Sequence, residues 1–120
     1  MNSTKKFDIK DRTLEFAIRI VKLIRKFPKD SAGMVLGTQL VRAGTSIGAN
    51  MEEADGASTR KDFFNKVSIA RKEARETRYW LKVVVGSELL NHPSNINEAK
   101  DLVEESTELV KILSSIISKK

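Results

Sequence analysis

The sequence predicts an all-α protein, an up-down-up-down antiparallel bundle of four helices. Three observations support this fold class. Apolar residues recur at spacings of three and four along four long segments, which is the period of helices that face a core. Short polar loops separate these segments, so each helix should return beside the one before it. The alternating pattern of β-strands is absent from the 120 residues.

The first helix is expected at residues 11–27. Asp11 can cap its first amides, and Pro28 should end it, because proline pushes the preceding residue out of the helical conformation. The apolar residues of this helix form two seams, and we expect both to belong to one wide apolar face. One seam holds Leu14, Ile18 and Val21, and the other holds Phe16, Ile20, Leu23 and Phe27.

The second helix is expected at residues 31–54, with Asp30 or Ser31 as its N-cap. At about 100° per residue, two parallel stripes run along this helix. The apolar stripe holds Leu36, Leu40, Ile47, Met51 and Ala54, and the glycine stripe beside it holds Gly33, Gly37, Gly44 and Gly48.

The glycine stripe requires a compensating contact, because each glycine costs a helix about 0.5–1 kcal/mol relative to alanine. Close approach of another backbone would supply it, and we predict that these four glycines line an interface between copies of the chain. The alternative is that the helix kinks or ends early near Gly44. A membrane-spanning use of the spaced glycines is excluded in practice by charged and amide side chains along the same helix.

The third helix is expected at residues 59–88, where Thr59 and Asp62 have the form of a capping box. It should end near Gly86 or a turn later at Leu90. Its core seam alternates spacings of four and three, as in coiled-coil bundles. The seam holds Phe63, Val67, Ala70, Ala74, Thr77, Leu81 and Val84.

The fourth helix is expected at residues 95–118, after a loop at residues 91–94, with Asn95 and Glu98 as its cap. Its core positions follow the same period. They are Ile96, Ala99, Leu102 or Val103, Ser106, Leu109 or Val110, Leu113, and Ile116 or Ile117.

Composition limits the functional classes. The chain has 22 Lys and Arg against 16 Asp and Glu, a net charge of +6, which makes an anionic partner plausible. There are no cysteines, so disulfides and thiol chemistry are excluded, and a cytoplasmic location is expected. Neither a signal peptide nor a membrane-spanning segment is expected, because the longest purely aliphatic run has only three residues, 83–85.

The positive charge is concentrated on the first and third helices. On the third, basic residues share one side with two aromatic residues, as single-stranded nucleic acid requires for its phosphates and bases. A solvated charged face, or one paired with an acidic groove of a neighbouring subunit, would have the same pattern. The candidate nucleic-acid-binding residues are Arg60, Lys61, Phe64, Arg71, Lys72, Arg75, Arg78, Tyr79 and Lys82.

No enzyme or cofactor signature is evident in the sequence. His92, the only histidine, precedes a proline in a predicted loop, and no arginine lies at the spacing of a small helical nuclease motif. Four glutamates could in principle surround a metal, but a di-iron bundle also needs histidines. Ion pairs with Arg42, Lys66 or Lys72 are the simpler expectation for Glu52, Glu53, Glu73 and Glu76. Asn50, at the edge of the apolar stripe, could fix the register between helices.

Two runs carry a family resemblance, QLVRAGTSIGANMEEA at residues 39–54 and KEARETRYWL at residues 72–81. They resemble the bacterial four-helix-bundle proteins encoded in intervening sequences of 23S ribosomal RNA genes. The resemblance implies a small cytoplasmic bundle that assembles as a ring, typically a pentamer, without established enzymatic activity. A related branch, the accessory protein of diversity-generating retroelements, is similar in fold and binds nucleic acid through basic surface alongside a reverse transcriptase.

These observations together predict a non-enzymatic homo-oligomer, most simply a pentamer. It would bind RNA or single-stranded DNA through the basic side of the third helix, with a reverse transcriptase as a further candidate partner. The alternative is a structural or protein-interaction oligomer without a nucleic-acid role. Catalytic residues, metal ligands and cofactors are not predicted.

Overall fold

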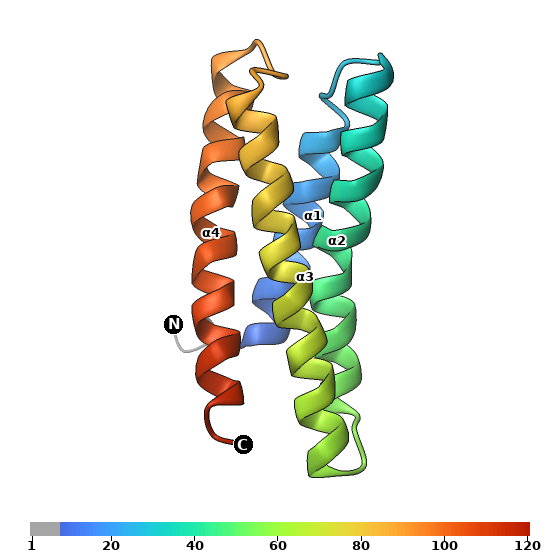
Figure 1. Ribbon diagram of the computed structural model, residues 1–120, viewed down its shortest axis with the longest axis vertical. Coiled ribbons are helices and arrows are strands. Elements are labelled where there is room, and N and C mark those ends of the chain that lie inside the picture. The colour runs from blue at the N-terminus through green and yellow to red at the C-terminus, as the bar shows by residue number, and fades with distance from the viewer. Residues whose placement is uncertain (1–7) are drawn as a thin grey trace.

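The computed structural model describes residues 8–120, which fold into four long helices joined by short loops. The helices are α1 (Ile9–Ile24), α2 (Ser31–Asp55), α3 (Arg60–Gly86) and α4 (Pro93–Ile117). Consecutive helices run in opposite directions, with α2 and α4 on either side of α3 and α1 behind (Figure 1). The predicted all-α four-helix bundle is confirmed.

The core lies along the shared axis of the bundle, because each helix turns one apolar stripe inwards. Phe16 and Ile20 of α1 meet Leu40 and Ile47 of α2 there. The α3 and α4 contributions follow the predicted periods, except that Phe64 rather than Phe63 is buried at the start of α3 and that Ile96, Ile116 and Ile117, near the ends of α4, are only partly buried. The α3 and α4 residues that are buried are Phe64, Val67, Ala70, Ala74, Thr77, Leu81, Val84, Ala99, Leu102, Ser106, Leu109 and Leu113.

Helix α1 begins earlier than predicted, because the carboxylate of Asp8, not that of Asp11, accepts from the first free amides. It also ends earlier, at Ile24, and residues 25–27 form a turn before Pro28. The predicted α2 cap is confirmed, since Asp30 Oδ1 accepts a hydrogen bond of 2.8 Å from the Gly33 amide.

The cap of α3 is confirmed too, because the Thr59 side chain accepts from the Asp62 amide at 3.0 Å. The cap of α4 differs from the prediction. His92 takes the N-cap position with Pro93 after it, and His92 Nδ1 lies 3.2 Å from the Ser94 amide. Proline suits the first helical position because it lacks the N–H that would be unpaired there. The helix therefore starts two residues before Asn95.

Only one of the two α1 seams enters the core. The seam with Phe16 and Ile20 is buried, whereas Leu14 is 57% exposed and Ile18 and Val21 are each 40% exposed. The expected wide apolar face is therefore wrong in part. Helix α1 packs mainly against α2 and only lightly against α4, so no element of residues 8–120 covers its outer side.

Three of the four glycines of α2 lie against α1 of the same chain, and Gly33 lies against Pro28 in the loop between the two helices. A Cβ atom at Gly44 would lie 3.0 Å from two Ile20 carbons, and one at Gly37 would lie 3.1 Å from Ile24. One at Gly48 would meet the side chain and backbone of Thr13 at 3.3–3.4 Å. At Gly33 it would overlap the Pro28 carbonyl oxygen.

This close approach corrects the predicted role of the glycine stripe in joining copies of the chain. The intrachain contact offsets the cost of the glycines, because it lets α1 and α2 pack closely. Helix α2 is continuous through Gly44 to Asp55, so the alternative that it ends early is wrong.

Helix α3 ends in a left-handed residue that is not glycine. Glu88 has a φ of 57°, and the Leu89 amide bonds back to the Val84 carbonyl at 3.3 Å, as in a Schellman cap. Gly86, where the sequence suggested the end, is the last helical residue and has no positive φ. The left-handed backbone conformation is therefore strained at Glu88, because this residue has a Cβ atom.

Replacing Glu88 by glycine should raise the free energy of unfolding by about 1 kcal/mol, because glycine adopts this conformation without a steric penalty. Urea denaturation followed by circular dichroism would measure the change. Glu88→Ala serves as the control, since it removes the carboxylate and keeps the Cβ atom. If the free energy of unfolding rose equally in both variants, loss of the carboxylate charge and not relief of backbone strain would be the cause.

Candidate nucleic-acid interface

The predicted basic residues lie along α3, and the arginines among them begin at the side that borders α4. Arg71 Nη1 lies 3.3 Å from the hydroxyl of Ser114, and Arg60 donates to the Lys119 carbonyl oxygen at 2.8 Å. Arg78 follows Arg71 by seven residues and so repeats its position two turns along. The structure therefore brings these guanidinium groups to one edge between α3 and α4.

The cations on this edge have no carboxylate partner within residues 8–120. Arg71 and Arg78 are half-buried along their stems, and Arg75 and Lys82 are exposed. Lys61 and Lys72 are exposed on the outer side of α3. The seven ion pairs formed by residues 8–120 use six cations, none of which lies on this edge: Lys10, Arg12, Arg19, Arg42, Lys66 and Lys111. We call Arg71, Arg75, Arg78 and Lys82 the basic edge.

The two aromatic residues of the predicted interface differ in solvent exposure. Phe64 is only 7% exposed and makes an edge-to-face contact of 5.1 Å with Phe63, so it cannot stack on a base. Burial of an aromatic side chain stabilises the fold by about 1.5–3 kcal/mol, which explains why Phe64 joins the core. Arg60 covers its ring at 4.9 Å. Tyr79 is 60% exposed in the single chain.

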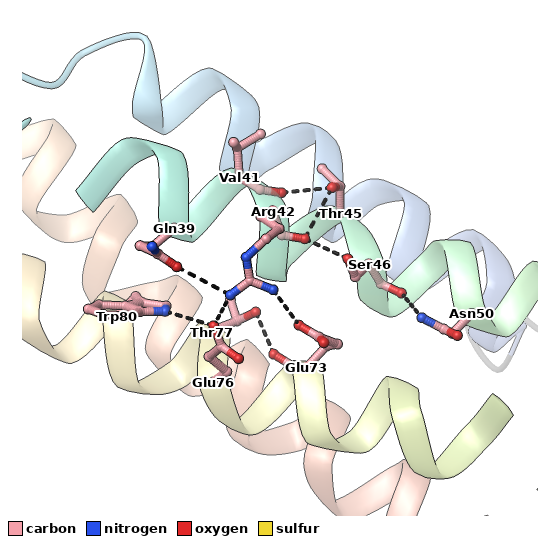
Figure 2. Close-up of polar contacts among 10 residues, drawn as sticks. All are labelled: Gln39, Val41, Arg42, Thr45, Ser46, Asn50, Glu73, Glu76, Thr77 and Trp80. Atoms are coloured by element: carbon pink, nitrogen blue, oxygen red, sulfur yellow. Dashed lines mark hydrogen bonds and ion pairs between the residues drawn. The ribbon is translucent and has the colours of Figure 1, made fainter. Parts of the chain in front are cut away.

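On the other side of α3, a polar cluster connects it to α2. Arg42 extends from α2 and pairs with Glu76, while its Nη1 lies 3.5 Å from Glu73 Oε1 (Figure 2). The indole N–H of Trp80 donates to Glu76 Oε2 at 3.2 Å. The predicted pairing of Arg42 with these glutamates is confirmed, and so is that of Lys66 with Glu53.

Trp80 is the member of this cluster that sequence reasoning missed. The available signal was its spacing, four residues after Glu76, which places both side chains on one face of the helix. Asn50 also lies near the α2/α3 boundary, but its Nδ2 donates to the Ser46 carbonyl of its own helix at 2.8 Å (Figure 2). It therefore does not set the register between helices.

The environment of Glu76 favours its ionised form. The hydrogen bond from Trp80 is the largest cause that lowers the pKa of Glu76 below its ordinary value of 4.5, and Arg42 lowers it further. Because the folded-state pKa is depressed, this carboxylate stabilises the fold fully above pH 4.5. The contribution is lost as the pH falls through the lower folded-state pKa.

Acid titration should therefore change the fluorescence of Trp80, the only tryptophan, with a midpoint below pH 4.5. Protonation of Glu76 weakens the hydrogen bond from the indole, which alters the emission. Circular dichroism of the same samples would show whether the helices persist at that pH. Glu76→Gln should remove this step, and a midpoint at or above pH 4.5 would contradict the depressed pKa.

Residues 8–120 contain no group of three or more His, Cys, Asp or Glu side chains arranged to hold a metal ion. None of their helices is long and apolar enough to cross a membrane.

A family model described as the 23S rRNA-intervening sequence protein matches residues 5–115. The chain belongs to this family. The match includes all of α1, α2 and α3 and most of α4. It therefore covers both the basic edge and the Arg42 cluster.

A solved structure from Bacteroides thetaiotaomicron VPI-5482 is similar to this 23S rRNA-intervening sequence family member. It is a protein of unknown function from the S23 ribosomal protein family, and 43% of the aligned residues are identical. The alignment covers 91% of this chain and 97% of that chain, with a TM-score of 0.80. No curated protein shows a significant match to the chain.

Proposed function

We propose that this protein is a non-enzymatic, homo-oligomeric bundle that binds RNA or single-stranded DNA through the basic edge of α3. The observation that carries the proposal is a row of cations without carboxylate partners in residues 8–120. A net charge of +6 favours the same class of partner. The absence of cysteines suits a cytoplasmic location.

The spacing of the basic edge fits a phosphate backbone. Arg71, Arg75, Arg78 and Lys82 lie four, three and four residues apart, which is about 4.5–6 Å along the helix at 1.5 Å per residue. Contacts with phosphates carry no sequence information, so binding should be independent of sequence.

Oligomerisation would strengthen such binding, because several basic edges could contact one strand at a high effective concentration. The family resemblance suggests a ring of five copies, and the exposed apolar side chains of α1 support an assembly of some kind. A structural oligomer without nucleic-acid binding is the alternative. The two functions differ in whether or not the basic edge binds nucleic acid.

Fluorescence anisotropy with a labelled 30-nucleotide RNA tests the proposal. If about five phosphates are neutralised, the logarithm of affinity should fall with that of salt at a slope of about −3.5. The combined Arg71→Glu, Arg75→Glu and Arg78→Glu variant should weaken binding for all sequences and flatten this slope. Loss of Tyr79 should cost about 1–3 kcal/mol if a base stacks on its ring.

The matched control reverses three exposed lysines elsewhere, Lys26→Glu, Lys29→Glu and Lys100→Glu, and changes the net charge equally. It should retain most of the affinity if the site is the basic edge. Equal losses in both variants would mean that net charge alone attracts the strand. Absence of binding at 50 mM salt and 10 µM protein would leave the structural oligomer as the function.

A further inference from the structure

The large apolar side chains that are exposed gather on two adjacent faces of the bundle. The outer α1 face consists of Leu14, Ile18 and Val21, together with Met34 of α2. The α2/α3 face consists of Val35, Ile69 and Tyr79. Within residues 8–120, helix α4 carries no exposed large apolar residue. The two faces meet along α2, since α2 packs against both α1 and α3.

The outer α1 face is apolar over most of its length. Its side chains are 40–64% exposed, and two hollows follow the junction of α1 with α2. Mostly apolar and small residues line these hollows, among them Ala17, Thr38 and Val41, and the charged residues Lys10, Lys29 and Glu52 complete the linings. Contiguous apolar surface of this kind marks a protein–protein contact.

The α2/α3 face surrounds the Arg42 cluster. Val35 precedes Arg42 by seven residues on α2, and Ile69 precedes Glu76 by seven on α3, so each shares the side of its helix with the cluster. Tyr79 contacts Trp80 edge to face at 5.1 Å. Arginine, tryptophan and tyrosine are the residues that most often dominate binding energy in protein interfaces.

We propose that the outer α1 face of one copy docks onto the α2/α3 face of the next copy. This inference rests on the proposed oligomer and names its contact surfaces. The contact joins two different faces, so it repeats from copy to copy and closes into a ring if the rotation allows. Because the faces adjoin at α2, each step turns the chain of copies instead of extending it straight. Helix α4 and the basic edge stay outside the contact, whereas Tyr79 lies inside it, so in the assembled protein its ring packs against the next copy and does not stack on a base.

Charge complementarity favours a second copy as the occupant. Helices α1 and α3 run in the same direction, so their first turns lie at the same end of the bundle (Figure 1). Near that end, α1 exposes Asp11 and Glu15, while its exposed cations Lys22, Arg25 and Lys26 lie at or beyond its other end; the first half of α3 exposes Lys61 and Lys72 as well as Asp62. Copies arranged in parallel around a ring would bring these opposite charges together.

Lys72 can take part in this contact between copies while the four residues of the basic edge remain accessible to nucleic acid. It lies between Arg71, which contacts α4, and Glu73, which contacts Arg42 of α2. Its side chain therefore lies on the outer side of α3.

The size of the surface is adequate for such a contact. Helix α1 has 16 residues and is about 24 Å long, and neighbouring helix axes lie about 8–10 Å apart. An outer face two helices wide therefore offers about 400–500 Å², roughly half of the 800 Å² per partner of a standard interface, and in a closed ring every copy makes two such contacts.

Light scattering on a size-exclusion column tests the two faces separately. Ile18→Glu blocks the outer α1 face and Ile69→Glu blocks the α2/α3 face, while Ser115→Glu on the exposed side of α4 is the control. Both blocking variants should fall to the mass of one chain, 13.5 kDa, with unchanged helical circular dichroism. The control should keep the mass of the unmodified protein.

Mixing the two blocked variants gives the decisive result. One intact pair of faces remains between them, so the mixture should form a dimer of about twice 13.5 kDa and nothing larger. If Ile69→Glu leaves the mass unchanged, the outer α1 face binds itself or another surface, and the proposal fails. If the unmodified protein is a monomer at tens of micromolar, the proposed oligomer fails first. An oligomer that neither variant weakens would overturn only the choice of faces.

Discussion

Replacing Gly44 by leucine is expected to lower the free energy of unfolding by about 3 kcal/mol. A Cβ atom alone would lie 3.0 Å from two carbons of Ile20, and Gly44 is buried, so the longer side chain has no space. The α1 and α2 backbones would have to separate, which would also loosen the packing of Phe16 nearby. Thermal denaturation followed by circular dichroism would measure the loss.

Alanine substitutions provide the matched series, because each brings the same gain in helix propensity of up to about 1 kcal/mol. Gly33→Ala should still destabilise, since its Cβ would overlap the Pro28 carbonyl. Gly86→Ala should stabilise, since nothing lies within 4 Å of its Cβ position. If Gly44→Leu instead lowered the oligomer mass and left the melting temperature unchanged, the glycines would face another chain.

Reversing Arg12 and Arg19 to glutamate is expected to cost about 3 kcal/mol in all, after allowance for partial exposure of the four side chains involved. Each arginine donates two hydrogen bonds of 2.6–3.0 Å to one glutamate of α4, Glu105 and Glu98 respectively. These pairs reinforce the seam between α1 and α4, where the helices otherwise pack lightly. Urea denaturation would measure the effect.

Exchanging the charges separates electrostatics from packing. Arg19→Glu combined with Glu98→Arg should recover part of the stability that Arg19→Glu loses, because the pair can form again in reverse. The hydrogen bonds that Arg12 donates to Glu105 and Arg19 donates to Glu98 raise the pKa of both guanidinium groups above the ordinary value for arginine. Their contribution is therefore lost only as the pH rises through those higher values, and added salt is the practical way to weaken it.

The helices could be predicted from the sequence because periodicity and caps act locally. Asp30 and Thr59 bind the amides within their own first turns, and the α3 seam from Val67 to Val84 repeats regularly. The side of α1 that faces the core could not be predicted in this way. Leu14 and Phe16 belong to seams of equal regularity, and only the position of α2 and α4 decides which one is buried.

The candidate site was predictable in its charges but less so in its aromatic residues and glycines. A basic row remains at the surface because burying a charge is costly, so Arg75 and Lys82 are exposed as predicted. Phe64 and Phe63 are adjacent and equally apolar, and the packing of α3 against its neighbours selects Phe64 for the core. A glycine stripe shows that something approaches closely, but the sequence does not say whether it is the same chain.

The connectivity of the bundle has a consequence for how the chain folds. The α1/α2, α2/α3 and α3/α4 contacts each join helices that are consecutive in the sequence, so each needs only a short loop to close. Such local topologies fold quickly, because little chain entropy is lost before contacts form. The seam between α1 and α4 alone joins the two ends of the chain. We therefore expect it to close last and open first, with the α2–α3 hairpin as the earliest folded unit.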